Sequence, residues 1–563
     1  MKQNTIYAFI ILSFLHLSLP TLNGQDAFTG LKDKYYDGIL TEEEYSQNLK
    51  SLYLTLLDGN YRAEPGERAI KCLFGIRAEA VGYMSQVEKS ALAAVEHRPV
   101  TQAFYVTPEG HFKIHYDTTG VHAVQVERLL GESVPDWIYH TGKAYERSWS
   151  LLTDSLGYIS PPVDSVDGDE VDVYIQDLAP GDYGLTFWEQ NKTSYIVMDN
   201  DFAESIYFSQ DLDGMRVTAA HEFFHPVQLG YALPSGSNLW YYELASTWFE
   251  DVAYDEVNDY VQYIESYYSR ANSSLYRTNG LQAAIWGKFL EESYSAPIMR
   301  NVWEQMAENS PEIALDNALK STNSEVDGMK AAFGKFALWN WFTGSRSRAG
   351  VFFEEAGLYP EFTAATNTTL SDTSIIAPFI GLNQLAFRIH RFEPTRSSAM
   401  KAHLTPLGKS NVWGSVMTSS PPQIISLPPG ISTLVAAVNT GTGLIIAAAN
   451  GSVISSEAGR ERYSIEVTVT GVPPSTVIAQ YPNPFNTVTK TNIDFDLGAA
   501  TSSIVFTVFD ILGRRVYRET LGDLDEGENS VTFIPGVQLS TGIYLYRIAG
   551  TGVEINGKFT LMR

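Results

Sequence analysis

Two histidines four positions apart are the side chains in this sequence best placed to bind a metal ion together. They lie in residues 218–231 as His221 and His225, and Glu222 directly follows the first. On a helix, residues four positions apart share a face, so both imidazoles can reach one ion. Glu222 is rotated by about 100° from His221, away from the ion but within reach of a water bound to it. This pattern is typical of zinc hydrolysis, in which the adjacent carboxylate activates the zinc-bound water.

A catalytic zinc site also needs a third protein ligand and one open position. Glu243 is the candidate, because Gly and Pro in residues 230–237 allow the chain to reverse into a second helix that begins near residue 238. Thr247 and Glu250 share a face of that helix with Glu243. We therefore expect them to be able to bond the N–H groups of the histidines.

Pro226 directly follows the second histidine and disturbs the predicted helix. It removes the backbone hydrogen bond to the Glu222 carbonyl, which costs about 3 kcal/mol in a helix interior, so we expect a kink there. The alternative to a metal site is a pair of histidines on a helix flank, both bonded to carbonyl groups.

HEFFH followed by ELASTWFED resembles the gluzincin zinc metallopeptidases, in which the third ligand is a glutamate on the following helix. More narrowly, HFKIHYDTTG, YGLT, TAAHEFFHPVQLGY and YYELASTWFED resemble a group of secreted bacterial metallopeptidases. The resemblance implies a zincin-like α+β domain in residues 100–345 and hydrolysis of peptide bonds in protein or peptide substrates. It implies one catalytic Zn²⁺ on His221, His225 and Glu243, with Glu222 as the general base.

Three details refine this resemblance. Thr247 stands where thermolysin-like relatives carry an acidic residue that supports a histidine. The sequence contains no GxMEN stretch, which favours internal cleavage over aminopeptidase action. Tyr276 is a candidate for stabilising the oxyanion. A protein of another class stays open as the alternative: a non-catalytic cell-surface binding or adhesion protein with a structural or inactive metal site.

The C-terminal end carries a series of motifs over about residues 481–563: QYPNPFNTVTKTNIDFDLG, VFDILGRRVYRE, LDEGENSVTF, LSTGIYLYRI and GKFTLMR. Their alternation predicts a small antiparallel β-sandwich. They resemble the type A C-terminal sorting domain of the type IX secretion system. The resemblance implies export by that machinery to the outside, or to the outer-membrane surface, of a Gram-negative bacterium. A generic Ig-like binding module is the alternative.

The N-terminal end predicts export as well. Lys2 and a short apolar run in residues 6–19 form a signal peptide, residues 1–24, too short to span a bilayer comfortably. Residues 25–99 are predicted to be helical, and Thr41 with Glu44 forms a capping box. We call residues 25–99 the leader. It is predicted to be a propeptide, with an ordinary N-terminal helical subdomain as the alternative.

The remaining chain divides into segments by its pattern of predicted helices and strands. Residues 104–120 predict a β-hairpin that carries His111 and His115, a weak alternative metal pair. Residues 193–200 predict an edge strand along which a substrate peptide could lie. Turn-rich strands follow the helices and predict a multidomain chain: a β-sandwich in residues 346–472, a linker in 473–480, and the C-terminal sandwich.

Composition limits the partners. The formal net charge of −26 disfavours nucleic acid, and the mature chain shows no second apolar run long enough to span a membrane. The acidic runs DSVDGDEVD and DNDF make Ca²⁺ a possible second ion. The single cysteine, Cys72, reads as a small buried apolar residue, or alternatively as a thiolate that blocks a metal in a precursor.

Overall fold

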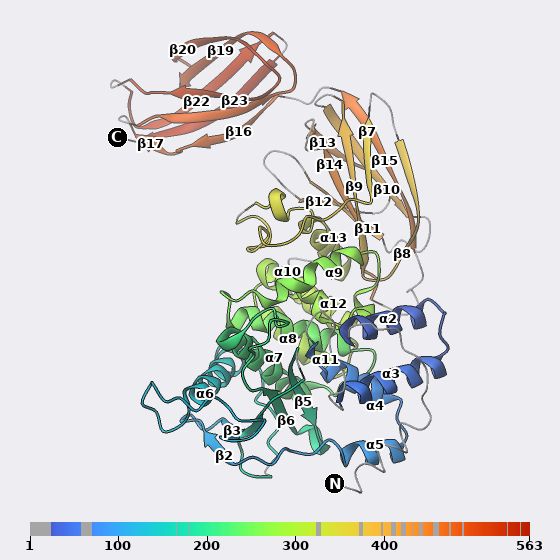
Figure 1. Cartoon of the computed structure of the whole chain (residues 1–563). Helices are drawn as coiled ribbons and strands as arrows, with labels where there is room; N and C mark the ends of the chain where they lie inside the picture. Colours follow the sequence, from blue (N-terminus) through green and yellow to red (C-terminus); the bar gives the residue numbers. More distant parts are fainter. Residues whose placement is uncertain are drawn as a thin grey trace. The chain divides into compact units, whose positions relative to one another are not determined.

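The computed structural model divides into two compact units, each described here by itself (Figure 1). Unit 1 contains Met1–Met329, Phe342–Glu361 and Val453–Ser455, and unit 2 contains Lys330–Trp341, Phe362–Ser452 and Ser456–Arg563. The predicted signal peptide lies outside the described residues. The structure describes residues 24–57, 70–164, 166–179, 181–322, 328–348, 350–370, 375–395, 398–406, 412–417, 424–428, 430, 432–438, 443–453, 461–471, 475–486, 489–536, 539–551 and 553–562.

A six-stranded sheet forms the centre of unit 1, with the strand order β1-β5-β6-β4-β3-β2. The pairs β1–β5, β6–β4 and β4–β3 are parallel, whereas β5–β6 and β3–β2 are antiparallel. The strands β2 and β3 are the predicted hairpin. The strands are β1 (Ile70–Cys72), β2 (Ala103–Val106), β3 (Phe112–Tyr116), β4 (Val171–Gln176), β5 (Asp182–Trp188) and β6 (Ser194–Asp199).

The prediction of an edge strand at residues 193–200 is wrong. This segment is β6, which lies between β5 and β4 inside the sheet. All its residues are buried, so its near-continuous apolar pattern marks a strand covered on both faces rather than one at an edge. The strand that would border solvent is β5, and the short strand β1 covers its outer side.

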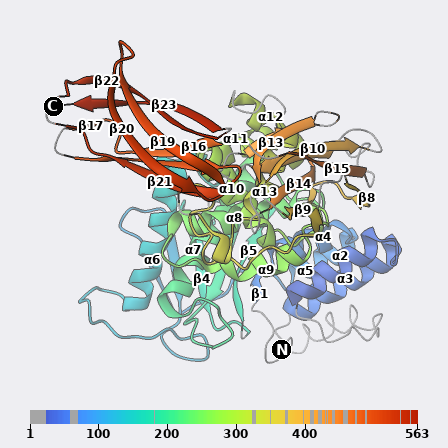
Figure 2. The same cartoon turned by 90° about the horizontal axis from the view of Figure 1, so that it is seen from above.

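Alternate residues of the central strands face two different helical layers. Leu185, Phe187 and Tyr195 join the apolar cluster of the leader, whereas Thr186 and Met198 face the helices α6 and α7. Figure 2 shows α2 to α5 on one side of unit 1 and α6 on the other. The helices are α2 (Gly24–Tyr36), α3 (Glu42–Leu57), α4 (Phe74–Gly82), α5 (Gln86–Ala93), α6 (Asp136–Trp149, continued by a π-turn at Ser150–Ser155) and α7 (Asp211–Tyr231).

The described part of the leader is mainly helical, as predicted, but it also contains the strand β1 (Ile70–Cys72), which was not predicted. The backbone N–H of Glu44 donates to Oγ1 of Thr41, and that of Thr41 donates to Oε2 of Glu44, so the predicted capping box is present. Residues 74–93 contain two helices rather than one continuous stretch. A second capping box, in which Ser85 and Glu88 bond reciprocally, starts α5 and thereby ends the first helix.

A helical layer after the sheet completes unit 1. The helix α8 packs on α7, and α10 packs on α8. Residues 346–361, predicted to open the sandwich, belong to unit 1, where Glu355 accepts a hydrogen bond from the Tyr260 hydroxyl. The helices are α8 (Leu239–Ala253), α9 (Ile264–Ser269), α10 (Ala284–Tyr294), α11 (Pro297–Met306) and α12 (Pro311–Ser321); α13 (Met329–Trp339) lies almost wholly in unit 2.

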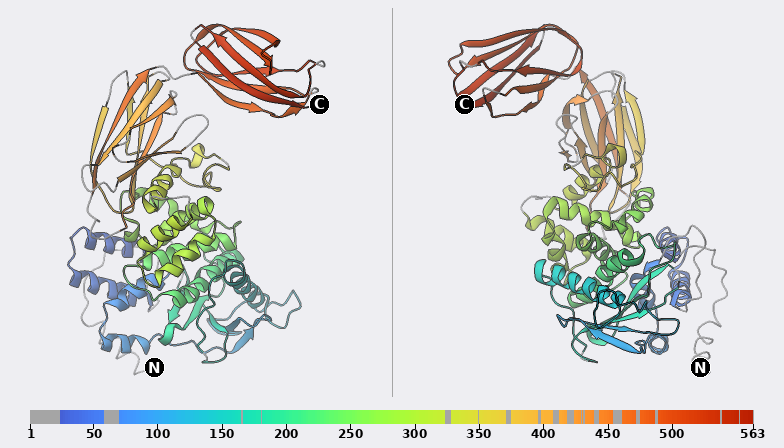
Figure 3. Two further views of the ribbon diagram at one scale, coloured as in Figure 1. Left: turned by 180° about the vertical axis from the view of Figure 1, so that it is seen from behind. Right: turned by 60° about the vertical axis from the view of Figure 1, so that its left-hand side comes forward.

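Unit 2 holds two β-sandwiches, so the chain is a multidomain α+β protein as predicted. The first packs a four-stranded sheet, β13-β10-β15-β8, on a five-stranded one, β12-β11-β14-β9-β7. Figure 3 shows these strands in yellow and orange. Its strands are β7 (Thr366–Leu370), β8 (Ile375–Leu382), β9 (Ala386–Pro394), β10 (Ser398–Pro406), β11 (Val412–Met417), β12 (Ile424–Leu427), β13 (Ser432–Val438), β14 (Leu444–Asn450) and β15 (Glu461–Gly471).

The second sandwich pairs a three-stranded sheet, β16-β18-β21, with a five-stranded one, β17-β23-β22-β19-β20. The predicted linker 473–480 overlaps β16, which pairs with β18 from Thr476 to Tyr481, so those residues belong to the sandwich. The turn residues that suggested a linker end just before that strand. The strands are β16 (Thr476–Tyr481), β17 (Phe485–Asn486), β18 (Thr491–Leu497), β19 (Thr501–Asp510), β20 (Arg515–Leu524), β21 (Gly527–Phe533), β22 (Gly542–Gly550) and β23 (Val553–Met562).

Candidate metal centre

The helix α7 carries both histidines and continues through Pro226 without ending there. Pro226 leaves the Glu222 carbonyl without its usual backbone donor. The Thr186 hydroxyl on β5 lies 3.1 Å from that carbonyl oxygen and 2.6 Å from Oε2 of the same residue, so its single hydrogen is shared between them. The neighbouring strand therefore offsets part of the cost of the proline and ties the centre of α7 to the sheet.

His221 lies between two carboxylates of α8. Its Nδ1 is 2.7 Å from Oε1 of Glu250, and its Nε2 is 3.3 Å from Oε2 of Glu243. Both glutamates can reach the same imidazole because positions 243 and 250 of α8 are about two turns apart and lie on one face of the helix. The predicted contact of Glu250 with a histidine is thus present, and it leaves Nε2 of His221 directed toward Glu243.

His225 is oriented by its own helix. Its Nδ1 is 2.8 Å from Oε1 of Gln228, and the Gln228 amide in turn donates to the Tyr242 carbonyl at 3.0 Å. On its other side, Nε2 of His225 is 3.4 Å from Sγ of Cys72. The ring of Phe74 stacks on the imidazole with centroids 4.1 Å apart.

Glu243 is positioned by backbone rather than by another side chain. The N–H of Gly75 donates to Oε1 of Glu243 at 2.8 Å. Gly280, with φ +94°, lies so close that a Cβ there would be 2.4 Å from Cβ of Glu243. Two glycines thereby fix where this carboxylate can lie, and Oε2 is the oxygen turned toward His221.

Glu222 projects toward the sheet. Its Oε2 accepts a hydrogen bond of 2.6 Å from the Thr186 hydroxyl. Gly184 makes room for the carboxylate, because a Cβ at that position would be 3.0 Å from Cγ of Glu222. The second oxygen, Oε1, has no hydrogen-bond partner within the described part of the chain.

Three buried polar atoms in this centre lack a well-formed hydrogen bond to any described residue: Nε2 of His221, Oε1 of Glu222 and Oε2 of Glu243. Leaving such groups unsatisfied is costly, and a metal ion is a partner that meets several at once. Ligand atoms of Cys72, His221, Glu222 and His225 all lie within 4.8 Å of one another. The predicted ligand Glu243 is not in that group, and its Oε2 is next to His221 alone among the two histidines, 3.3 Å from Nε2. Two imidazoles and carboxylates are ligands that suit Zn²⁺, so the residues fit such an ion.

The charges of the centre favour the same ion. Burial opposes a positive charge on His221, but the carboxylates of Glu243 and Glu250 outweigh it and raise its pKa to about 10. Burial lowers the pKa of His225 well below its usual value. Burial also raises the pKa of Glu222 to about 7, and that of the Cys72 thiol well above its usual value. The surrounding carboxylates thus call for positive charge at Nε2 of His221, which a divalent cation would provide.

Other residues that the sequence suggested lie elsewhere. Thr247 is buried, and its hydroxyl has no hydrogen-bond partner among the described residues. Tyr276 packs edge-on against Tyr36 of the leader, 5.5 Å between centroids. His111 bonds to Glu146 and stacks on Trp149, whereas His115 bonds to Asp172 and stacks on Tyr174, and neither belongs to a group of possible metal ligands among the described residues.

The two acidic runs have different partners. Asp164 and Asp172 pair with Arg98, and Asp167 pairs with Lys113 at 2.5 Å, so three of the five acidic residues of the first run are paired with cations. In the second, Asp199 accepts backbone N–H bonds that include one from Phe202 at 2.8 Å. Asp199, Asp201 and Glu204 lie together, and Ca²⁺ stays a prediction there.

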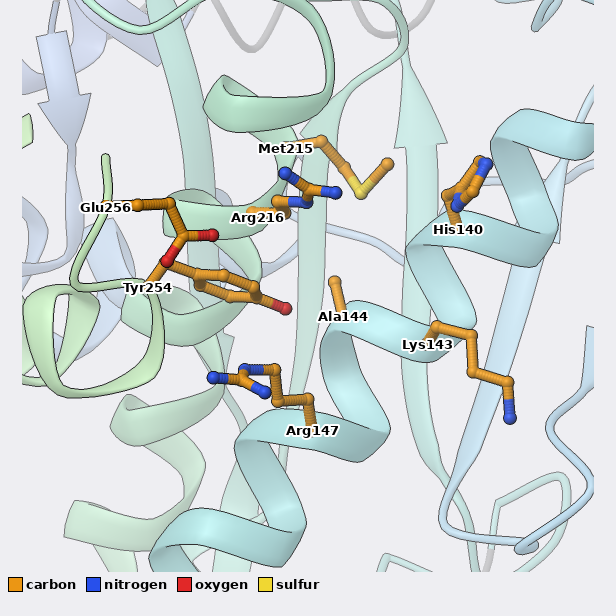
Figure 4. A pocket seen from close by; sticks show the side chains of 8 residues that line it. All are labelled: His140, Lys143, Ala144, Arg147, Met215, Arg216, Tyr254 and Glu256. Atoms are coloured by element: carbon orange, nitrogen blue, oxygen red, sulfur yellow. The ribbon is translucent and has the colours of Figure 1, made fainter.

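Sequence reasoning missed Gly75, Thr186 and Gly280 as parts of this centre, and also Lys71, whose Nζ lies 3.1 Å from Oε2 of Glu250. Short-range spacing carries no signal for them, because each comes from a segment remote from the two helices. It also missed a surface pocket of about 310 Å³ between α6 and α7, in which Arg147 and Arg216 lie on either side of Tyr254 (Figure 4). The pocket is lined by His140, Lys143, Ala144, Arg147, Met215, Arg216, Tyr254 and Glu256, none of which belongs to the metal centre.

Comparison with known proteins identifies the C-terminal sandwich. A family model described as a secretion system C-terminal sorting domain matches residues 479–561. The chain therefore carries the sorting domain of type IX secretion, and the protein is secreted or held at the cell surface. Within the described residues, no helix is long and apolar enough to cross a membrane. No curated protein matches the sequence.

Similar solved structures share little of the chain. A GH2 beta-galacturonidase from Eisenbergiella tayi is 10% identical, with 33% of this chain and 34% of that one covered and a TM-score of 0.15. The adhesin domain of Epf from Streptococcus pyogenes is 8% identical, with 34% and 79% covered and a TM-score of 0.13. The chain thus spans about a third of the galacturonidase, and TM-scores this low support no statement about fold or function.

Proposed function

We propose that this protein is a secreted zinc-dependent metalloendopeptidase. His221, His225 and Glu243 would hold the ion, and Glu222 would act as the general base. The observation that carries the proposal is the grouping of possible ligand atoms of His221, Glu222 and His225, with the unsatisfied Oε2 of Glu243 lying 3.3 Å from Nε2 of His221. A bound Zn²⁺ would act as a Lewis acid, polarising the scissile carbonyl and stabilising the negative charge that develops on its oxygen.

Glu222 has the surroundings that a proton carrier needs. Thr186 fixes Oε2, so Oε1 is the oxygen left to accept a proton from water and to return it to the departing amine. Burial brings the pKa of its carboxyl to about 7, where both protonation states are populated at neutral pH. Glu250 would hold His221 through Nδ1, and Gln228 would hold His225 in the same way.

The outer side of β5 supports an endopeptidase in particular. Extended peptides bind to proteins by adding a strand to a sheet edge. The strand β5 carries Gly184 and Thr186 beside Glu222, so a peptide laid along it would bring a backbone carbonyl next to the base. Nothing in such binding requires a free terminus.

The test compares the zinc content and the casein cleavage of wild-type protein and Glu222→Gln. Each protein is assayed before and after limited digestion with trypsin, and the trypsin is inhibited before the assay. We expect zinc content to be equal and cleavage of casein to fall by about 10²–10⁴-fold in the variant. Glu265→Gln, an exposed carboxylate on α9, is the matched control and should cleave normally. Wild-type protein that holds zinc but is inert on casein and on a blocked peptide library would contradict the proposal, and action on unblocked peptides alone would indicate an aminopeptidase.

A further inference from the structure

One short segment of the leader contacts His225, Glu243 and Glu250 of the metal centre. It comprises β1, Leu73 and α4, residues 70–82, and we call it the latch. Three of its residues and one backbone N–H face the centre from a single direction. Nζ of Lys71 is 3.1 Å from Oε2 of Glu250, Sγ of Cys72 is 3.4 Å from Nε2 of His225, the Phe74 ring stacks on His225, and the Gly75 N–H bonds Glu243.

The latch also covers the side of β5 on which an extended peptide would bind. The strand β1 pairs with β5 in parallel, with Ile70 opposite Asp182 and Cys72 opposite Gly184. Gly184 is the residue whose missing side chain makes room for Glu222. The register therefore brings the thiol of Cys72 to the point of the strand nearest the proposed base.

Cys72 completes the set of ligands. The side chains of His221 and Glu243 are 0% and 4% exposed, and their unsatisfied Nε2 and Oε2 point into the centre that the thiol faces. Two imidazoles, one carboxylate and one thiolate make four ligands, which is the number that a tetrahedral zinc site takes. A thiolate bound there would occupy the one position that a catalytic site leaves open, and binding releases the thiol proton.

We propose that Cys72 is the fourth ligand of the metal centre and that the latch keeps the protein inactive until the leader is displaced. This inference rests on the proposed function. It assigns Cys72 a role that the sequence left open between a buried apolar residue and a blocking thiolate. It also explains why β1, only three residues long, is aligned with the centre rather than elsewhere on the sheet.

Two features distinguish a latch from a permanent fourth ligand. A structural zinc site has no use for a general base, yet Oε1 of Glu222 is unsatisfied beside the thiol. Besides the shared apolar cluster and the buried pairs of Lys71 with Glu250 and Asp259, the leader is joined to the rest of unit 1 through ion pairs that are partly open to solvent. These are Arg98 with Asp164, Asp172 and Glu189, Arg270 with Asp33, and Arg277 with Asp37.

Cobalt tests the ligand directly, without relying on activity. Full-length protein and Cys72→Ala are loaded with Co²⁺, and both are measured for metal content and near-ultraviolet absorption. We expect about one Co²⁺ per chain in both, and a thiolate-to-cobalt charge-transfer band in the wild type alone. Leu52→Ala, which removes a buried side chain of the leader that contacts no member of the centre, is the control and should keep the band.

Three outcomes of the cobalt experiment would contradict the proposal. A wild-type protein that binds Co²⁺ without the band would show that Cys72 is not a ligand. Loss of the metal in Cys72→Ala would make the cysteine a structural ligand and overturn the latch. Failure of both proteins to bind Co²⁺ would overturn the latch and the metal centre together.

Cleavage separates the latch from the proposed function. With zinc bound, Cys72→Ala should cleave casein at least tenfold faster than undigested wild type, and trypsin digestion should activate the wild type but change the variant little. Equal activity of variant and undigested wild type would overturn the latch while leaving the peptidase proposal standing. A band lost on Cys72→Ala together with no cleavage by any form would support the ligand and contradict the peptidase.

Discussion

Among the described residues, the histidines with no exposed surface lie in two regions, and their surroundings differ. In unit 1, His221 and His225 are 0% exposed on α7, and in the first sandwich His390 is 0% exposed on β9. Both nitrogens of His390 have neutral partners, because Nδ1 is 3.0 Å from the Thr366 hydroxyl and Nε2 is 2.8 Å from that of Tyr463. On α7, by contrast, Nε2 of His221 faces a carboxylate and has no well-formed hydrogen bond.

The difference shows what marks a metal centre. The histidines are equally buried in both regions, so burial alone does not distinguish a metal ligand from a histidine of the core. The charge nearby separates them: burial lowers the pKa of His390 to about 3, whereas the carboxylates of Glu243 and Glu250 raise that of His221 to about 10 despite burial. A buried histidine flanked by carboxylates lies where a cation is favoured and is a ligand candidate, whereas one satisfied by hydroxyls is part of a core.

The largest expected effect comes from moving Glu243, the residue that makes the two regions differ. Gly280→Ala would place a Cβ 2.4 Å from that of Glu243 at a φ of +94°. Overpacking costs about 1–3 kcal/mol, and the positive φ about 1–2 kcal/mol more. We expect unfolding at lower urea and weaker zinc binding in a chelator competition.

Gly110→Ala is the control for that change. Gly110 has a φ of +83° and nothing within 4 Å of the added carbon, so it carries the backbone cost alone. Equal zinc affinity in the two variants would show that contact with Glu243 does not position the carboxylate.

Acid should next weaken the first sandwich through His390. The neutral side chain is favoured in the folded state, so its contribution is complete above the unfolded pKa of 6.5 and is lost as pH falls toward about 3. At pH 4.5 the loss is about 2–3 kcal/mol. Urea unfolding with pulsed hydrogen–deuterium labelling of β9 measures it at pH 7.5 and 4.5. His390→Gln, which cannot gain a proton, should show that much less acid sensitivity, and an unchanged pH dependence would contradict the assignment.

Glu250 should have a smaller effect, confined to the metal. Glu250→Gln keeps the shape but removes the charge that supports Nδ1 of His221, and loss of such support weakens metal binding about 10–100-fold. Asp251→Asn is the matched control, because it changes the next residue of α8, which pairs with Lys288 at 2.5 Å instead. Competition with a fluorescent zinc chelator measures both, and equal affinities would remove Glu250 from the centre.

The smallest effect is expected at the hairpin. His111 and His115 are each bonded to a different carboxylate. His111→Gln and His115→Gln should therefore leave the zinc content of the protein unchanged. A fall in zinc content in either variant would mean that the hairpin binds metal after all.

The sequence predicted those parts of the centre that follow from helix geometry. His221 and His225 are fixed by one helical turn, and Glu250 follows from two turns of α8. Cys72 and His225 are 153 residues apart, and no local pattern brings such residues together. The edge strand was misassigned for a related reason, since strand order depends on pairing between distant segments. Thr186 was unpredictable because its role is to satisfy a carbonyl that a proline on another element leaves unpaired.

Metal content measured by mass spectrometry on equilibrated, desalted protein tests the central claim most directly. The account predicts about one zinc per chain in the wild type and in His390→Gln, and none in Glu243→Ala. Wild-type protein that takes up no zinc, or Glu243→Ala protein that keeps a full equivalent with unchanged affinity, would contradict it.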